Sequence, residues 1–204
     1  MIECFNYCGG EWQKPSGEEL RVVSPYNNKV IGCAYASTMR DIDNVVTAAA
    51  TAQKAWGETP IKERSQVLFR FREILLAELK DIAACTSNEC GKTLNEAEAE
   101  ILKGIEVTEF ALSLQNLDLG GRLEVSRGVF CEYRREPLGV VAGITPFNFP
   151  AMVPMWMIPI ALALGNSFIW KPSDKTPLTS RLLANALTRA GLPAGVFSVV
   201  HGGR

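Results

Sequence analysis

The spacing of hydrophobic residues changes twice along the chain. Between residues 38 and 119, apolar residues recur every three or four positions, as in amphipathic helices. From residue 122 to 135 they alternate with charged residues, as in a β-hairpin. From residue 138 onward, short apolar runs alternate with helical stretches in the order strand, helix, strand, helix, strand. The pattern predicts an α/β fold of amino-terminal helices, a hairpin and a βαβαβ unit.

Three amphipathic helices are expected before the hairpin, preceded by short strands and turns in residues 1–37. We expect the second helix to continue unbroken to Gly91 and the third to reach Gly120. Such one-sided helices need a partner surface, which the later strands supply. The expected buried positions are Ile42, Val45, Val46, Ala49, Ala52 and Trp56; Val67, Leu68, Phe71, Ile74, Leu75, Leu79 and Ile82; and Leu94, Ala97, Ile101, Ile105, Thr108 and Leu112.

The helix ends carry their own signals. Thr38 with Asp41, and Thr93 with Glu96, have the form of capping boxes, in which each side chain satisfies an unpaired backbone N–H. Gly91 is expected as a carboxyl-terminal cap because glycine tolerates the left-handed conformation found there.

The last part of the chain predicts half of a dinucleotide-binding sheet. Strands are expected at residues 138–144, 167–170 and 196–200, with helices at residues 151–165 and 176–190. Parallel strands this apolar are normally flanked by further strands, and the pattern provides only three. At least one apolar edge would stay open. We therefore expect the front part of a longer fold, or a fold that another chain completes.

This division predicts three structural parts. Residues 1–121 form the strand and helix part of the cofactor-binding domain. Residues 122–137 form a hairpin that leaves the body of the molecule and is suited to oligomerisation. Residues 138–204 form the first βαβαβ of an open parallel sheet, which is incomplete.

Composition narrows the possible partners. A hydrophobic content of 47% and a charged content of 21% are ordinary for a globular protein. The net charge of −1 gives no electrostatic reason to expect nucleic acid or an anionic membrane as partner. The apolar stretch 151–165 is shorter than the ~20 residues of a membrane span and contains two prolines.

The 6 cysteines lack the two-residue spacing of zinc and redox motifs, and the single histidine is distant in sequence. We expect no metal site, and free thiols in a cytoplasmic protein. We also expect no secretory signal, because the first residues lack a basic start and an apolar run. Cys131 is expected to pack within the hairpin, Lys92 to be a surface charge, and His201 to be a loop residue without a chemical role.

Asn148 and Lys171 follow two neighbouring predicted strands, at the edge where ligands of open α/β sheets bind. A carboxamide there is a suitable donor to a developing oxyanion, and an ammonium suits ribose hydroxyls or phosphate. From spacing alone, Asn148 is equally consistent with a turn residue, and Lys171 with a solvated strand end.

Several segments together resemble the aldehyde dehydrogenase superfamily along essentially the whole chain, and within it the methylmalonate-semialdehyde dehydrogenases. The resemblance lies in Pro146-Phe-Asn-Phe-Pro-Ala-Met-Val-Pro154, Gly165-Asn-Ser-Phe-Ile-Trp-Lys-Pro-Ser-Asp174, Thr176-Pro177, Gly191-Leu-Pro-Ala-Gly195, Val200-His-Gly, Glu89-Cys-Gly-Lys-Thr93, Lys103-Gly-Ile-Glu106 and Glu109-Phe-Ala111.

The resemblance implies oxidation of an aldehyde, with NAD as hydride acceptor, to an acid or an acyl-CoA; CoA would be the acyl acceptor. It makes Asn148 the catalytic donor to the oxyanion, and Lys171 and Asp174 the partners of the adenosine ribose hydroxyls. By position, Thr145, Pro146 and Phe147 line the same cofactor groove.

Two features depart from the family pattern. The nucleophilic cysteine, the general-base glutamate and the glycine loop near the pyrophosphate lie beyond residue 204 in the family. Lys103 stands where the semialdehyde enzymes usually carry an arginine that binds the substrate carboxylate. Lysine keeps the charge but loses the bidentate fork.

We therefore expect a (methyl)malonate-type semialdehyde dehydrogenase, a dimer or tetramer of identical chains, whose residues 1–204 alone are inactive. The alternative is a non-catalytic short product that binds nucleotide or joins other subunits through the hairpin. An unrelated short-chain oxidoreductase is disfavoured because the first strand lacks a glycine-rich turn.

Overall fold

A five-stranded sheet forms the centre of the computed structural model, which describes residues 1–116 and 120–203. Its strand order is β3-β2-β10-β9-β8. The neighbours β8, β9 and β10 run parallel, which confirms the predicted βαβαβ unit, while β2 and β3 join it antiparallel. The strands are β2 (Asn6–Cys8), β3 (Glu11–Gln13), β8 (Val140–Ile144), β9 (Ser167–Lys171) and β10 (Phe197–Val199).

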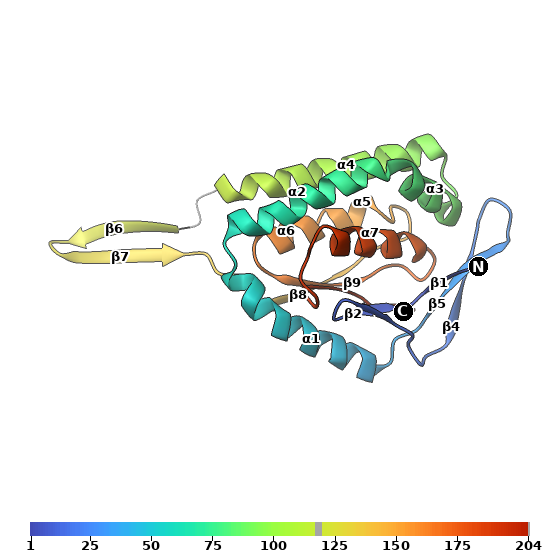
Figure 1. The fold of residues 1–204 in the computed structure, drawn as a ribbon, viewed down its shortest axis with the longest axis horizontal. Helices are drawn as coiled ribbons and strands as arrows, with labels where there is room; N and C mark the ends of the chain where they lie inside the picture. Colours follow the sequence, from blue (N-terminus) through green and yellow to red (C-terminus); the bar gives the residue numbers. More distant parts are fainter. Residues whose placement is uncertain (117–119, 204) are drawn as a thin grey trace.

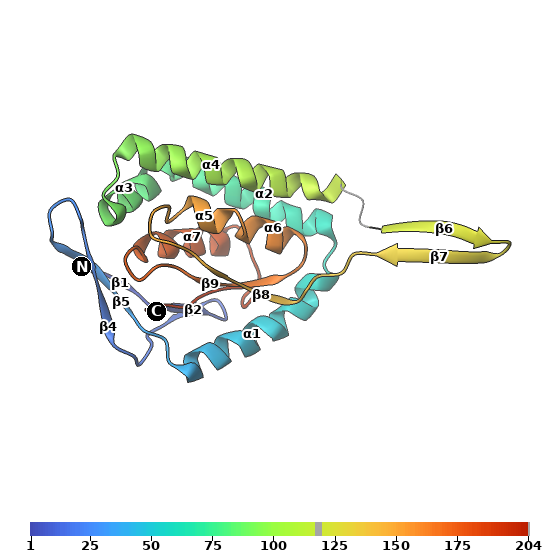
Figure 2. The same ribbon diagram turned by 180° about the vertical axis from the view of Figure 1, so that it is seen from behind.

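Helices cover both faces of this sheet, so the predicted α/β architecture is confirmed (Figures 1 and 2). One face carries α1, and the other carries the crossover helices α5, α6 and α7, with α2, α3 and α4 forming a further layer outside them. The helices are α1 (Met39–Glu58), α2 (Ile61–Ala77), α3 (Leu79–Cys90), α4 (Leu94–Ser113), α5 (Met152–Met155), α6 (Ile158–Ala163) and α7 (Leu178–Arg189), with a short 3-10 turn at Leu114–Asn116.

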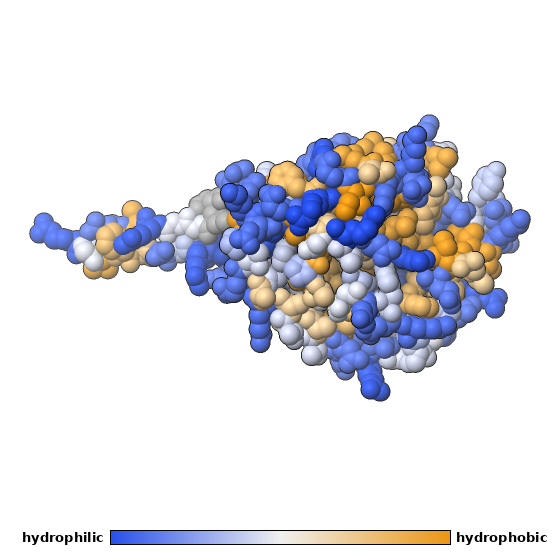
Figure 3. All heavy atoms as spheres, in the orientation of Figure 1, coloured by the Kyte–Doolittle hydropathy of each residue, from blue (hydrophilic) through white to orange (hydrophobic). Residues whose placement is uncertain are grey.

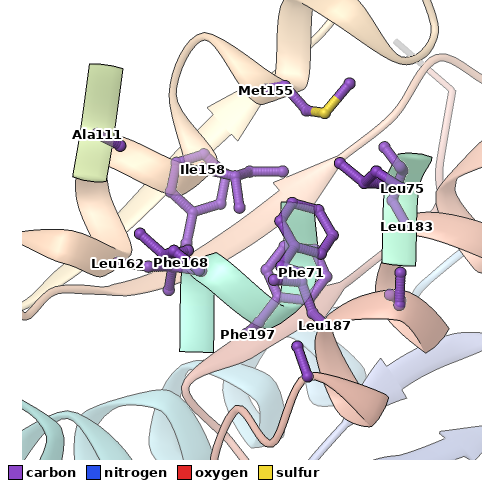
Figure 4. Packing of buried hydrophobic residues seen from close by; sticks show 14 of the residues in the cluster. Phe71, Leu75, Ala111, Met155, Ile158, Leu162, Phe168, Leu183, Leu187 and Phe197 are labelled. Atoms are coloured by element: carbon purple, nitrogen blue, oxygen red, sulfur yellow. The ribbon is translucent and has the colours of Figure 1, made fainter. Parts of the chain in front are cut away.

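The main hydrophobic core lies between the sheet and these two helical layers. Side chains from α2 meet those of the crossover helices α5, α6 and α7 and those of the strands beneath them (Figure 4). Burying each large side chain contributes about 1.5–3 kcal/mol, so this region dominates the stability of the fold. The labelled members are Phe71, Leu75, Ala111, Met155, Ile158, Leu162, Phe168, Leu183, Leu187 and Phe197.

The predicted helix caps are present. Thr38 and Thr93 each accept a hydrogen bond from the backbone N–H three residues later, and both capping boxes are complete. Gly91 ends α3 in the left-handed conformation with φ +79°. A side chain at Gly91 would also meet Pro25, so this position requires glycine for two reasons.

Two predicted helices are in fact divided. The second stripe breaks at Glu78, which leaves the helical conformation (φ −105°, ψ 15°) and pairs with Arg189 of α7 at 2.6 Å. The apolar stretch 151–165 forms two short helices, because Pro159 cannot donate within a helix and instead takes a first-turn position in α6. Residues 117–119 of the predicted third helix lie outside the described residues.

Two positions expected to be buried are not. Val46 is 43% exposed and Leu94 is 55% exposed, because both lie at the margin of their apolar stripes. The stripes therefore predict the buried face but overestimate its width.

The expectation of only three strands is wrong. The amino-terminal β2 pairs with the edge of β10, with Tyr7 opposite Val199, and β3 continues the sheet beyond it. Strands of three residues show too little alternation to be assigned to a sheet by pattern. The opposite edge, β8, has no further strand among the described residues. The amino-terminal segment also forms a separate three-stranded sheet of β1 (Ile2–Cys4), β5 (Val30–Tyr35) and β4 (Glu19–Val23).

The hairpin extends away from the body, as the sequence predicts (Figure 1). It consists of β6 (Gly120–Ser126) and β7 (Val129–Arg134), and every residue of β7 is exposed. Cys131 is therefore exposed, which corrects the prediction that it packs within the hairpin. Figure 3 shows hydrophobic residues beside charged ones along this arm. Within residues 1–116 and 120–203, no helix is long and apolar enough to cross a bilayer.

Candidate functional site

The loop after β8 and the segment after β9 begin side by side at one edge of the sheet. Ile144 lies opposite Lys171 in the parallel register, and the Thr145 N–H donates to the Lys171 carbonyl at 3.2 Å. The Thr145 hydroxyl is buried and accepts a hydrogen bond from the Trp170 indole N–H at 2.9 Å. The carboxyl ends of two adjacent parallel strands thus meet where the sequence places the candidate residues.

Asn148 lies on an exposed loop that borders a surface cavity of about 710 Å³. Its backbone carbonyl accepts a hydrogen bond from Lys92 Nζ at 2.9 Å. The Cys90 thiol lies 3.4 Å from the Phe147 carbonyl and 3.7 Å from that of Asn148. Lys103, the predicted substrate-binding residue, lines the same cavity, so the structure brings Asn148 and Lys103 together.

Lys92 corrects an expectation, because it is a largely buried charge and not a surface one. Its side chain is 12% exposed and forms an ion pair with Glu100, whose side chain is 0% exposed. The ammonium also lies 4.3 Å from the centre of the Phe149 ring. Glu100 in turn accepts the N–H groups of Ala151 at 2.8 Å and Met152 at 3.1 Å.

A second buried carboxylate, Glu89, holds the start of α7. It accepts the N–H groups of Leu178 at 2.7 Å and Thr179 at 2.9 Å, together with the Thr179 hydroxyl. Burial raises the pKa of Glu89 to about 7, although the hydrogen bonds from Thr179 and Leu178 act in the opposite direction.

The predicted ribose-binding pair lies at the carboxyl end of β9, with Lys171 as the last residue of the strand and Asp174 just beyond it. Lys171 and Asp174 are both half-buried, and Asp174 accepts a hydrogen bond from the Ser173 hydroxyl at 3.3 Å. Pro146 and Phe147 are exposed on the neighbouring loop, and the Lys175 ammonium lies 4.8 Å from the centre of the Phe147 ring.

His201 lies outside any helix or strand, as predicted for a loop residue, but it is not exposed to solvent. It is buried, and its ring Nε2 lies 3.1 Å from the Phe5 carbonyl, which requires the ring nitrogen to donate. Its backbone N–H donates to the Asn6 side chain at 3.2 Å. Burial lowers the pKa of His201 to about 4, and the nearby positive charge of Lys171 adds to the effect.

Four of the cysteines, Cys4, Cys8, Cys85 and Cys90, have environments that disfavour the reactive thiolate. Burial raises the pKa of Cys4 and of Cys85 to about 12, and it also raises the pKa values of Cys8 and Cys90. No group of three or more potential metal ligands occurs within the described part of the chain.

Sequence reasoning did not select Glu89, Lys92 or Glu100. A signal was available for both carboxylates, because each lies on an apolar helical face that has no other reason to carry a charge. Glu100 stands between Ala97 and Ile101 of the buried stripe. A buried carboxylate requires compensating donors, which predicts a structural or catalytic partner.

Parallel strands, crossover helices and polar side chains gathered at their carboxyl ends define an open α/β fold of the dinucleotide-binding type. The sequence model described as "Aldehyde dehydrogenase family" matches residues 12–204. The chain belongs to the aldehyde dehydrogenase family, and the resemblance inferred from its motifs is confirmed.

The individual relatives to which the chain is similar are also dehydrogenases of this family. The chain is 42% identical over 199 residues to malonate-semialdehyde dehydrogenase 1 of Geobacillus thermodenitrificans (strain NG80-2), covering 97% of this chain and 41% of the relative. A solved structure of a putative methylmalonate-semialdehyde dehydrogenase from Sinorhizobium meliloti 1021, complexed with NAD, superimposes with a TM-score of 0.96 at 36% identity. That alignment covers 99% of this chain and 42% of the solved one.

A structure of 3,6-anhydro-L-galactose dehydrogenase in complex with NAP is also similar, with a TM-score of 0.93 and 33% identity over 98% of this chain and 43% of that one. The chain therefore spans about two fifths of the length of the relatives it matches.

Proposed function

We propose that residues 1–204 are part of an NAD-dependent aldehyde dehydrogenase that oxidises a malonate- or methylmalonate-type semialdehyde to an acid or an acyl-CoA. The observation that carries this proposal is the juxtaposition of Asn148 and Lys103 on one cavity, beside the paired ends of β8 and β9. The family membership and the semialdehyde dehydrogenases among the relatives support it.

In the proposed reaction, Asn148 stabilises the negative charge that develops on the aldehyde oxygen when a thiolate attacks the carbonyl carbon. Its loop is exposed at the cavity, and the carboxamide forms no hydrogen bond within residues 1–116 and 120–203. A donor already oriented toward the developing charge contributes more than water, because it needs no reorganisation. Lys103 would attract the carboxylate of a semialdehyde substrate into the same cavity.

The side chains at the carboxyl end of β9 fit a dinucleotide. Lys171 supplies a donor and Asp174 an acceptor, which matches the two hydrogen-bonding roles of vicinal ribose hydroxyls. The negative charge of Asp174 also disfavours a 2′-phosphate, so we propose NAD as the cofactor over NADP. When bound, NAD accepts the hydride of the aldehyde carbon.

Residues 1–204 alone are proposed to be inactive. The described thiols with raised pKa values, including that of Cys90 beside Asn148, are poor nucleophiles. The test is to assay the purified 204-residue chain for aldehyde-dependent NADH formation, with NAD binding measured by calorimetry. We expect binding without turnover, and turnover would contradict this assignment.

The reading frame beyond residue 204 provides a second test. An in-frame cysteine and a glycine-rich nucleotide loop are expected downstream, as in the family. Their absence would favour the non-catalytic alternative, in which the chain binds nucleotide or joins other subunits.

We further propose that the hairpin joins identical subunits into a dimer or tetramer. Leu123, Val125 and Val129 are exposed on it, and an isolated apolar arm of this kind is stabilised by a partner. Leu123→Glu should shift the mass in sedimentation toward the monomer. Val46→Glu, on the exposed side of α1, is the matched control and should leave the mass unchanged.

A further inference from the structure

The loop that carries Asn148 is held by one buried ion pair at two points, in its middle and where it enters α5. Lys92, which follows the cap of α3, donates to the Asn148 carbonyl, and its partner Glu100 accepts from the N–H groups of Ala151 and Met152. We name Lys92 and Glu100 the loop clamp. The clamp thus grips the chain just after the Asn148 Cα and again three residues later.

We propose that Lys92 and Glu100 are positioning residues that set the direction of the Asn148 carboxamide toward the reacting carbonyl. This inference rests on the proposed function, in which Asn148 is the donor to the oxyanion. The hydrogen bonds of Asn148 within residues 1–116 and 120–203 all involve its backbone carbonyl, with Lys92 and with the Cys90 thiol. Fixation of the backbone therefore sets the position and direction from which the carboxamide extends.

The ammonium of Lys92 contacts groups in or next to this loop. Its neighbours are the Glu100 carboxylate, the Asn148 carbonyl and the face of the Phe149 ring at 4.3 Å, all at or beside the loop. Since the pair is almost completely withdrawn from water, solvent screens it weakly, and the geometry is held more firmly than by a surface pair. A displacement of ~1 Å in a catalytic group lowers turnover by up to ~10²-fold, so a firm hold matters for rate.

The main test is Lys92→Met in the complete protein that contains residues 1–204. We expect kcat to fall by about 10- to 100-fold while NAD affinity changes by less than about threefold, because the clamp lies at the Asn148 loop and not at Lys171. Lys14→Met is the matched control. Lys14 also lies near a carboxylate, Glu3 at 3.7 Å, and over a ring, Tyr35 at 4.1 Å, but it is exposed and outside the cavity.

A double variant separates this inference from the proposed function. If Lys92 acts through Asn148, then Asn148→Ala combined with Lys92→Met should turn over no more slowly than Asn148→Ala alone. Two outcomes would overturn the positioning role but leave the proposed function standing. In the first, the losses in kcat of the two single variants multiply in the double variant. In the second, Lys92→Met keeps the wild-type kcat while Asn148→Ala loses much of it. Unchanged turnover in Asn148→Ala would remove the proposed function, and the inference with it.

Two further measurements guard against a folding defect. Lys92→Gln keeps an N–H donor of shorter reach, so it is a milder variant to which the same double-variant criterion applies. Hydrogen exchange of the Ala151 and Met152 amides, measured in the 204-residue chain, should become about tenfold faster in Lys92→Met than in Lys14→Met. Unchanged exchange would mean that the clamp does not hold the loop and would contradict the inference.

Discussion

Glu89 and Glu100 occupy comparable positions, but only Glu100 forms an ion pair among the described residues. Each is a buried carboxylate that accepts backbone N–H groups at the start of a later helix, α7 for Glu89 and α5 for Glu100. Glu100 has the ammonium of Lys92 beside it, whereas no ion pair of Glu89 is found among the described residues. The carboxylate that holds the Asn148 loop therefore has an ion-pair partner, whereas the carboxylate at the start of α7 is held by hydrogen bonds.

Removal of Glu100 should cause the largest loss in the free energy of unfolding. Glu100→Ala leaves the Lys92 ammonium without its partner and two N–H groups without acceptors, and breaking one side of a buried pair costs about 3–5 kcal/mol. Urea unfolding measures this loss in the free energy of unfolding. Glu106→Ala, which breaks the exposed pair with Lys103, should cause little change, and equal losses in both variants would contradict the distinction.

Glu89 should make stability depend on pH. Its raised pKa of about 7 means that the native state holds a proton that the unfolded state has lost between pH 4.5 and 7. Its contribution to the free energy of unfolding should therefore fall by about 3 kcal/mol as the pH rises through this range. The difference between wild type and Glu89→Ala, measured by urea unfolding at several pH values, should decrease accordingly. A difference independent of pH would refute this account.

His201 should act with the opposite sign. Because its pKa is lowered to about 4, the unfolded state binds a proton below pH 6.5 that the native state does not accept. Stability is therefore lost as the pH falls from 6.5 toward 4, by about 2 kcal/mol at pH 5. His201→Gln keeps a donor for the Phe5 carbonyl but cannot titrate. It should lose less stability than wild type between pH 7 and pH 5, and parallel curves would be the contrary outcome.

The smallest effect is expected at the start of α4, the helix that carries Glu100. Thr93→Ala removes the cap of α4, which begins between Glu89 and Glu100, and should cost about 1 kcal/mol. Thr38→Ala at α1 removes an equivalent capping box and serves as the reference. If Thr93 also supports the clamp, exchange at Met152 should accelerate in Thr93→Ala and not in Thr38→Ala.

Local patterns in the sequence predict local structure well in this protein. The capping boxes at Thr38 and Thr93 and the glycine cap at Gly91 depend on residues within one turn, and all three are present. The resemblance to the aldehyde dehydrogenase family also holds along nearly the whole chain. Asn148 and Lys103 share a cavity, yet their proposed roles stay predictions until they are tested.

Features that depend on distant partners could not be predicted in the same way. The break at Glu78 accompanies an ion pair with Arg189, far along the chain, and nothing in the stripe itself marks it. Lys92 looks like a surface charge in sequence because its burial depends on the loop that folds over it. Charged residues on apolar faces, such as Glu100, were the available clue, but a sequence does not state which donors they meet.

The pairing of β2 with β10 limits the order in which the central sheet can form during synthesis. Tyr7 lies opposite Val199, and its hydroxyl is 2.6 Å from that of Thr188, so β2 depends on residues that are synthesised much later. While the ribosome elongates the chain, β2 can pair with β3 on one side, but its other side has no neighbour in this sheet until β10 emerges. A deletion of residues 1–8 would expose the unpaired backbone of β10 and create a strand edge that is prone to aggregation.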